Sequence, residues 1–224
     1  SIAGWTLLNT LLLRWTSRRR APAAPDADRL PSLTVVVPCR DEAARLPAAL
    51  ASLAAQAYPG ELRVIVVDDG STDGSPTVAG HGLAPLGPRG SVLAASPKPD
   101  GWSGKGWAVA SGVRAAGTDL VLALDADTTL EPHGAAMLVR ELLAADADLV
   151  SGVTRYAMPT AGEQLAMPGY PMLLFGFVPA WVPALRGGRP ASLAFSYGPL
   201  QLVRRDAYLA TRGHAAVPGS HRED

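Results

Sequence analysis

Four short runs of aliphatic and β-branched residues constrain the fold of this 224-residue chain more than any other feature. Each run is nearly continuous in apolar side chains and is bounded by turn-forming residues. This pattern is typical of strands that are buried on both faces, as in a parallel sheet. The runs are Leu33–Pro38, Leu62–Val67, Ser91–Ala95 and Asp119–Leu124. A further short strand is predicted at Asp148–Ser151.

Alanine-rich stretches with helical spacing separate these runs. They cover Glu42–Ala57, Lys105–Ala116 and Pro132–Ala145, and Pro47 predicts that the first helix begins or kinks at that position. Strands that alternate with helices form right-handed βαβ units. The sequence therefore predicts an α/β fold with a doubly wound, mostly parallel sheet, whose ligands bind at the carboxyl ends of the strands.

Acidic residues follow three of the predicted strands. The first strand runs into Cys-Arg-Asp-Glu at 39–42, the second into Asp68 and Asp69, and the fourth into Asp125 and Asp127. Carboxylates that converge on one edge repel one another unless a cation lies between them. If the fourth strand continues, its two carboxylates lie on the same face. Oxygen ligands of this kind favour Mg²⁺ or Mn²⁺ that bridges a diphosphate, and a turn with solvated carboxylates is the alternative.

Residues 98–107 read KPDGWSGKGW and open the second predicted helix. Backbone N–H groups at a helix start and the ammonium of Lys105 can face a phosphate, which makes this segment a candidate anion site; an ordinary solvated lysine is the alternative. The segment is not a P-loop, because Pro99 and Gly106 stand where that motif needs Gly and a hydroxyl residue. No GxGxxG follows the first strand, so a dinucleotide cofactor is disfavoured.

Composition excludes other classes, and two apolar segments stand apart from the sheet pattern. Twenty basic and 20 acidic residues give a formal net charge of zero, which argues against a general nucleic-acid binder, and the single cysteine excludes a disulfide scaffold. The apolar segments are residues 1–15 and Leu165–Val182. The second suits a membrane-interface segment or an apolar acceptor groove, and equally a core helix and loop.

The first apolar segment precedes Arg18–Arg20. A helix of this length reaches roughly 20 Å, which is short of the roughly 30 Å hydrocarbon core. Because the chain begins with Ser, we interpret the segment as the end of a longer transmembrane helix, with an amphipathic surface helix or a disordered end as alternatives. The arginines then place the following residues on the cytoplasmic side of the cell membrane.

Four motifs occur in order along the chain. They are VVVPCRDE at 35–42, VVDDGSTD at 66–73, Asp125-Ala-Asp127 and Glu223-Asp224. Together they resemble the family 2 inverting glycosyltransferases with the GT-A fold, over residues 33–224. The resemblance implies a Rossmann-like sheet and a metal-dependent enzyme that takes its sugar from a nucleotide-diphosphate sugar, with UDP as the expected nucleotide.

The resemblance also implies roles in donor binding. Pro38, Arg40 and Glu42 match the first-strand motif that lines the nucleotide, although an aromatic residue is common in the family where Arg40 stands. Asp69, with Asp68 beside it, matches the residue that reads the base.

Three further carboxylates match the chemistry of the family. Asp127 matches the metal ligand, Asp125 the residue near the ribose and the metal, and Asp224 the catalytic base. The base takes the proton from the acceptor hydroxyl as that oxygen attacks the anomeric carbon, while the metal neutralises the departing diphosphate. This one-step displacement inverts the anomeric centre and needs no covalent enzyme nucleophile.

Shorter motifs narrow the resemblance to one branch. Gly101–Lys105, Phe195–Tyr208 and Gly213–Val217 are similar to the membrane-associated branch that includes hopanoid- and carotenoid-associated glycosyltransferases, which implies a lipid or terpenoid acceptor. We therefore divide the chain into an apolar helix with a basic end, a linker, a nucleotide-sugar-binding half and an acceptor-side half. These parts are residues 1–20, 21–32, 33–152 and 153–224.

Two alternatives to this enzyme remain open from the sequence. The chain ends at Asp224, so it can be a piece cut from a longer protein that binds a nucleotide sugar without turnover. The pattern Asp125–Thr129 also fits the DxDxT motif of haloacid-dehalogenase-type phosphatases, whose first Asp is a nucleophile. That chemistry usually needs a downstream lysine, and none follows Lys105.

Overall fold

A computed structural model describes five stretches of the chain. They are residues 29–95, 97–152, 154, 160–166 and 196–219. The chain divides into two compact units, one made of residues 23–154 and 197–224 and the other of residues 1–22 and 155–196. The described part of the second unit includes helix α6 (Ala161–Ala166), where Thr160 and Glu163 form a capping box.

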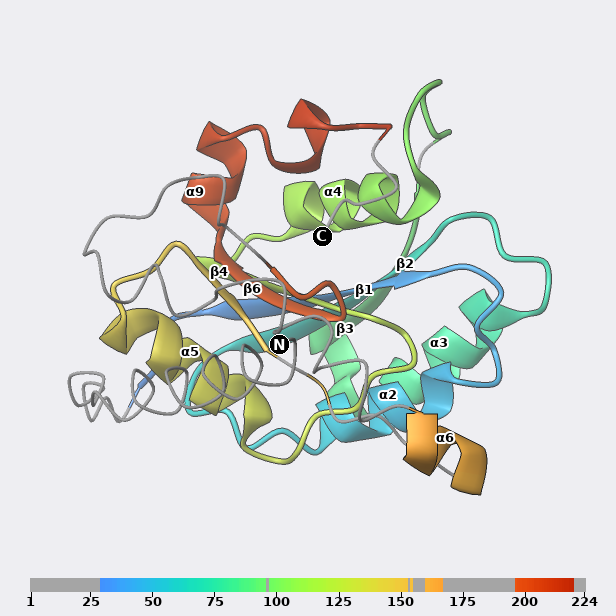
Figure 1. The fold of residues 1–224 in the computed structure, drawn as a ribbon, viewed down its shortest axis with the longest axis horizontal. Helices are drawn as coiled ribbons and strands as arrows, with labels where there is room; N and C mark the ends of the chain where they lie inside the picture. The colour runs from blue at the N-terminus through green and yellow to red at the C-terminus, as the bar shows by residue number, and fades with distance from the viewer. Residues whose placement is uncertain (1–28, 96, 153, 155–159, 167–195, 220–224) are drawn as a thin grey trace, which may run out of the picture. The chain divides into compact units, whose positions relative to one another are not determined.

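The first unit is built on a mixed sheet (Figure 1). Its described strands are β1 (Leu33–Cys39), β2 (Leu62–Asp68), β3 (Gly90–Ala94), β4 (Leu120–Leu124), β5 (Leu149–Ser151) and β6 (Leu200–Arg204). Their order is β3-β2-β1-β4-β6-β5, with β1 to β4 parallel and β6 antiparallel to both of its neighbours. The mostly parallel α/β sheet is confirmed, and β6, which the sequence pattern does not predict, lies between β4 and β5.

Strand β1 shows why the apolar runs are continuous. Val35 and Val37 belong to the core on one face of the sheet, and Val36 belongs to the core on the other face. None of the three has any exposed surface. Because successive side chains of a strand point to opposite faces, a strand that is covered on both sides must be apolar at every position.

Helices supply these two covers (Figure 1). Helices α2 (Leu46–Ala54), α3 (Ser75–Leu83) and α5 (Gly134–Ala144) contribute to one core, and α4 (Gly104–Ala115) contributes to the other. Helix α2 has Pro47 in its first turn, which confirms the predicted start at this residue. Helix α3 was not predicted, because its sequence SPTVAGHGL is rich in glycine; the short helix η1 (Ala84–Arg89) follows it directly.

Helix α4 lies unusually close to the sheet at Gly112. A Cβ atom at this position would lie 2.3 Å from Cγ1 of Val36 and 3.1 Å from Cγ2 of Val67. Glycine therefore allows the helix backbone to approach β1 and β2 closely, and this approach fixes where the first turn of α4 lies relative to the strand ends.

The C-terminal part of the described chain returns along α4. After β6, the chain forms α9 (Arg205–Ala210) and η3 (Gly213–Ala216). Ser103, the residue before α4, donates its N–H to the carbonyl oxygen of Pro218 at 2.8 Å. The hydroxyl of Tyr208 and Nδ1 of His214 are hydrogen-bonded at 2.6 Å, which ties η3 to α9.

Several predicted features fall outside the described residues. These are the apolar helix 1–20, most of the linker 21–32, residues 167–182 of the second apolar segment and the Glu223-Asp224 motif. Among the residues that the structure does describe, no helix is both long and apolar enough to cross a membrane.

Candidate functional site

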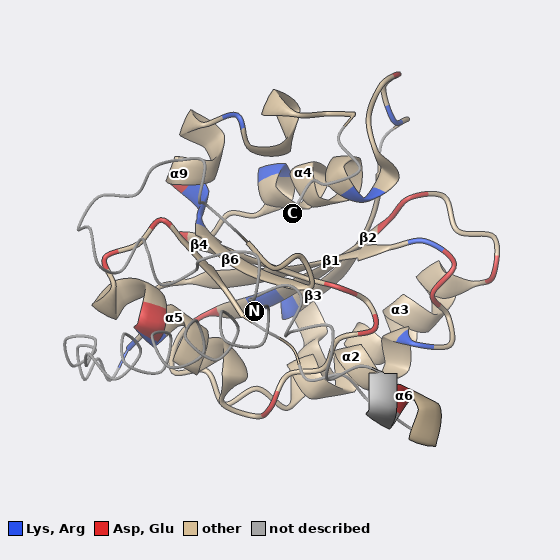
Figure 2. Cartoon of the chain, in the orientation of Figure 1, with Lys and Arg blue, Asp and Glu red and all other residues tan. Residues whose placement is uncertain are grey.

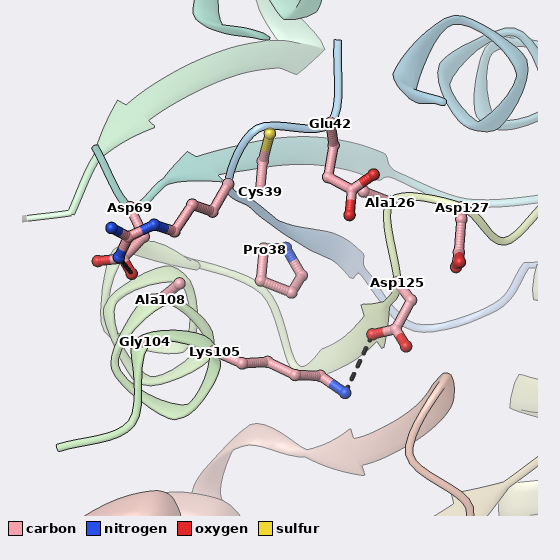
Figure 3. Close-up of a pocket in the computed structure, with 11 residues that line it drawn as sticks. Pro38, Cys39, Glu42, Asp69, Gly104, Lys105, Ala108, Asp125, Ala126 and Asp127 are labelled. Carbon is pink, nitrogen blue, oxygen red and sulfur yellow. Dashed lines mark hydrogen bonds and ion pairs between the residues drawn. The ribbon is translucent and has the colours of Figure 1, made fainter. Parts of the chain in front are cut away.

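A pocket of about 440 Å³ opens at the carboxyl ends of β1, β2 and β4, beside the first turn of α4 (Figure 3). Its lining residues are Pro38, Cys39, Arg40, Glu42, Asp69, Gly104, Lys105, Ala108, Asp125, Ala126 and Asp127. Among the described residues, the structure thus brings together every proposed donor-site and metal-site residue except Asp68. Figure 2 shows the acidic loops after β2 and β4 and the basic residues on α4.

Asp69 is held between a side chain and a helix start. Its N–H donates to the carbonyl oxygen of Cys39 at 2.9 Å, and its Oδ2 lies 3.3 Å from Nη1 of Arg40. A Cβ atom on Gly104 would lie 2.4 Å from the same Oδ2, so any larger residue here would make the Asp69 carboxylate shift. The Asp69 carboxylate therefore faces both a guanidinium and the positive end of the α4 dipole.

Asp68 has a different role from its neighbour. It is buried, and both of its carboxylate oxygens lie 3.3 Å from the N–H of Ser71, which donates to them. The side chain thus shapes the loop after β2 and does not line the pocket.

Two loops that border the pocket are joined by a set of hydrogen bonds that we call the loop clasp. Its members are Asp41, Ser71, Thr72, Asp73 and Ser75. Thr72 donates its N–H to Oδ1 of Asp41 at 2.7 Å and its hydroxyl to the same oxygen at 3.2 Å. Asp41, whose φ of 53° lies in the left-handed region, donates its own N–H to Oγ of Ser71 at 3.0 Å.

Asp73 completes the loop clasp from the other loop. Its Oδ2 accepts the N–H of Ala43 at 2.9 Å, and its Oδ1 accepts both the N–H and the hydroxyl of Ser75, at 3.0 and 2.5 Å. The hydrogen bond from the Ser75 side chain, followed by that from Ala43, lowers the pKa of Asp73. The sequence motifs do not predict the loop clasp, although a run of Ser, Thr, Asp and Gly after a strand is a known signal for such side-chain capping.

The acidic residues after β4 need one correction. The expectation of two carboxylates on one face assumed that the strand continues, but β4 ends at Leu124. Asp125 instead opens a turn, with its carbonyl oxygen accepting the N–H of Thr128 at 3.0 Å and its own N–H donating to Pro199 at 3.1 Å. Asp125 and Asp127 both line the pocket nevertheless, because the turn brings their side chains to its edge (Figure 3).

Lys105 is the second residue of α4, and its side chain extends toward the end of β4 (Figure 3). Its Nζ lies 3.2 Å from Oδ1 of Asp125, and about a third of its side chain is exposed. Ser103 caps the helix by accepting the N–H of Gly106 on its side-chain oxygen at 3.1 Å. The lysine is therefore anchored on a rigid helix start and reaches the acidic strand end through a flexible stem.

Residues 34–208 match the family model described as glycosyl transferase family 2. The chain belongs to glycosyltransferase family 2. An uncharacterized glycosyltransferase of Mycobacterium tuberculosis is 39% identical to it over 131 residues, which make up 58% of this chain and 51% of that protein. The chain thus spans about half the length of this curated relative.

Two solved structures share the fold. The mannosyltransferase PcManGT from Pyrobaculum calidifontis, in complex with GDP-Man and Mn²⁺, has a TM-score of 0.64 and 25% identity, and the match covers 94% of this chain and 55% of that one. Glucosyl-3-phosphoglycerate synthase from Mycobacterium tuberculosis, in complex with Mn²⁺, UDP-Glc and phosphoglyceric acid, has a TM-score of 0.51 and 25% identity, with 79% and 57% covered. The α/β sheet of this family 2 chain is thus GT-A-like.

The residues at the end of β4 fit a divalent cation. Within the described parts of the chain, no group of three or more His, Cys, Asp or Glu side chains is arranged to hold a metal ion. Asp125 and Asp127 supply hard oxygen donors at an open pocket edge, which suits Mg²⁺ or Mn²⁺ when a diphosphate and water complete the coordination. We therefore expect the end of β4 to supply two carboxylate ligands to the cation, from Asp125 and Asp127.

Cys39 contributes shape to the pocket. The residue is buried at the end of β1, and burial raises the pKa of its thiol, so it stays protonated near neutral pH. Asp224, the base expected from the family resemblance, lies outside the described residues. The last described part of the chain reaches Ser103 at Pro218, six positions before it.

Proposed function

We propose that this family 2 domain transfers a sugar, with inversion, from a nucleotide-diphosphate sugar to a hydroxyl or carboxyl group of a lipid or terpenoid, in a metal-dependent reaction. UDP is the expected nucleotide, and a hexose is the expected sugar. The observation that carries the proposal is the pocket itself, in which three acidic strand ends and the start of a helix with one lysine surround about 440 Å³. A pocket of this size suits a small ligand of the nucleotide class.

The charges of the lining residues support separate contacts to the base, the diphosphate and the metal ion of a bound nucleotide sugar. Arg40 and Asp69 together present a cation and a carboxylate at one end of the pocket, where a base can use both hydrogen-bond donors and acceptors. Lys105 and the first N–H groups of α4 suit the diphosphate. Asp125 and Asp127 suit the divalent cation, which when bound neutralises charge on the leaving diphosphate.

The known structures support the same donor class. The two solved relatives named above bind GDP-Man or UDP-Glc together with Mn²⁺. Their nucleotides carry different nucleobases, so these structures do not favour UDP over GDP. The experiment described below tests the expectation of UDP.

For the transfer step we assign Asp224 as the base. The six positions between Pro218 and Asp224 can span up to roughly 20 Å when extended, so the carboxylate can reach the pocket from the contact at Ser103. Its role is to accept the proton of the acceptor hydroxyl as that oxygen attacks the anomeric carbon. A single displacement of this kind inverts the anomeric configuration.

Two apolar segments and a basic cluster support the acceptor class and the location that we propose. The apolar residues 1–15, with Arg18–Arg20 after them, and the aromatic and aliphatic Leu165–Val182 suit contact with a membrane or with an apolar acceptor. We therefore place the domain at the cytoplasmic face of the cell membrane.

A thermal-shift screen of nucleotide sugars with Mn²⁺ tests the proposal, and calorimetry then measures the binding of the best donor. Asp127→Ala should abolish metal-dependent UDP binding, with Asp119→Ala as the matched control, since Asp119 hydrogen-bonds Ser32 away from the pocket. Unchanged metal-dependent binding in the Asp127 variant would overturn the site assignment. Release of phosphate from generic phosphoesters, with no donor binding, would favour the phosphatase instead.

A further inference from the structure

Lys105 and Asp125 form an ion pair across the pocket, with 3.2 Å between Nζ and Oδ1 (Figure 3). The two residues belong to different elements, because Lys105 lies in the first turn of α4 and Asp125 follows β4. Both side chains are partly exposed, at 34% and 27%, and both line the same pocket. The ammonium therefore lies against one of the two carboxylates to which a divalent cation is assigned.

This position gives Lys105 a part in the charge balance of the pocket. Among the described residues, those that line the pocket include four carboxylates, on Glu42, Asp69, Asp125 and Asp127, and two cations, Arg40 and Lys105. Arg40 is engaged with Asp69 at the far end, and Arg45, beside the pocket, pairs with Glu42, so Lys105 is the cation of this described set that pairs directly with Asp125. A metal ion that approaches Asp125 meets a like charge at hydrogen-bond distance, and this repulsion opposes its binding.

A diphosphate changes this balance. It brings negative charge to the start of α4, where Lys105 is mounted and where backbone N–H groups point outward. The lysine stem is flexible, so the ammonium can turn from Asp125 to a phosphate oxygen without movement of the helix. Asp125 Oδ1 then becomes available to the metal.

We propose that Lys105 is an exchangeable counter-ion that couples metal binding to nucleotide binding. Without a nucleotide the ammonium competes with the divalent cation for Asp125, and the diphosphate removes this competition by attracting the ammonium. Because such coupling is reciprocal, the metal must raise the affinity for the nucleotide by the same factor. The inference rests on the proposed donor site.

Titration of Mn²⁺ into the protein, with and without UDP or GDP and followed by electron paramagnetic resonance of the free ion, tests this role. In Lys105→Met we expect Mn²⁺ alone to bind roughly 5- to 20-fold more tightly, and the gain in Mn²⁺ affinity caused by the nucleotide to shrink by a similar factor. Lys105→Arg should restore the weak binding of Mn²⁺ alone. Lys98→Met is the matched control, because Lys98 donates to the carbonyl oxygen of Trp102 and does not line the pocket.

A second readout needs no substitution of Lys105. The chain has two lysines, so reductive ¹³C-methylation, which keeps their charge, gives two side-chain signals in an NMR spectrum. We expect the Lys105 signal to shift when UDP and the diamagnetic ion Mg²⁺ are added together, and the Lys98 signal to stay in place.

The outcomes separate this inference from the proposed function. If Lys105→Met leaves the affinity for Mn²⁺ alone unchanged or weaker, and the Lys105 signal does not respond to UDP with Mg²⁺, the counter-ion role is wrong even when the wild-type protein binds nucleotide. If the wild-type protein binds neither UDP nor GDP, the proposed function fails. Tighter binding of Mn²⁺ alone to Lys105→Met would then still support competition at Asp125.

Discussion

Asp41 and Thr72 lie 31 positions apart in the sequence, yet Oδ1 of Asp41 accepts both the N–H and the hydroxyl of Thr72, at 2.7 and 3.2 Å. This contact joins the loop that carries Arg40 to the loop that carries Asp69. Other hydrogen bonds between the two loops have the opposite donor direction: Ala43 donates its N–H to Oδ2 of Asp73, and Glu42 donates its N–H to Oγ of Ser75. The two loops are therefore cross-linked before any ligand arrives, so the separation of the strand ends is preset.

The loop clasp predicts an acid-dependent loss of stability. Hydrogen bonds lower the pKa of Asp73 below its usual 3.8 in the folded protein. A lowered pKa means that the contribution is complete above the unfolded pKa and is lost as pH falls through the folded value. We expect the urea midpoint of the wild-type protein to fall more steeply below about pH 4 than that of Asp73→Asn. Equal acid dependence in both proteins would contradict this role.

Arg40 should matter for donor binding and little for stability. Its side chain is 61% exposed, and exposed ion pairs contribute less than about 1 kcal/mol to folding. We expect Arg40→Ala to keep the melting temperature but to weaken UDP binding roughly tenfold, as for the loss of one charge-assisted hydrogen bond. Arg63→Ala is the control, since Arg63 pairs with Glu61 outside the pocket. Tighter UDP binding in Arg40→Ala would show that the pair with Asp69 competes with the base.

Gly112 and Gly80 should respond to alanine with opposite signs. A Cβ on Gly112 would collide with Val36, and forced overpacking costs about 1–3 kcal/mol of unfolding free energy. Nothing lies within 4 Å of a Cβ on Gly80, which is exposed within α3, so alanine there should add about 0.5–1 kcal/mol. Urea unfolding of Gly112→Ala and Gly80→Ala measures both effects. A neutral Gly112→Ala would mean that α4 can shift away from β1.

The assignment of Asp224 as the catalytic base predicts that one substitution changes the rate of transfer but not the affinity for UDP. Asp224→Asn removes the proton acceptor but no donor contact, so we expect UDP affinity to stay within about twofold while transfer falls by at least about 100-fold. Calorimetry and a transfer assay with the donor found in the screen measure the two effects. Transfer that persists in this variant would exclude Asp224 as the base.

The sequence predicts the parts of the fold that are buried on both sides, and it also predicts the edge strand β3, whose side chains are partly or fully exposed. Strands β1, β2 and β4 lie in the middle of the sheet, and double burial makes their apolar runs continuous. The sequence pattern does not predict β6, because Gln201, Val203 and Arg204 are partly exposed and the strand therefore mixes polar and apolar residues. Helix α3 is not predicted either, because Gly80 and Gly82 lower the helix propensity of its sequence.

The sequence predicts which strand ends form the site, because the topology of the sheet brings them together. It does not predict which side chains face the pocket, because local turns decide this. Parallel strands place their carboxyl ends at one edge, so Asp69 and Asp125 had to meet there. Which of two adjacent aspartates faces the pocket depends on the end of β2, where Asp68 pairs in register with Cys39 and turns inward to Ser71. The turn at Asp125 depends on Pro199, which no local pattern connects to it.

The place of β6 in the sheet also determines the order in which strands can pair while the chain is being synthesised. Strand β4 pairs with β1 on one side and with β6 on the other, and β5 joins the sheet only through β6. A ribosome makes β4 and β5 long before β6, so the nascent chain must hold β4 with one open edge until Leu200 emerges. The backbone of Asp125 is anchored to Pro199 at that same moment. The β4 end of the pocket, where we propose that the metal binds, is therefore the part that a growing chain completes last.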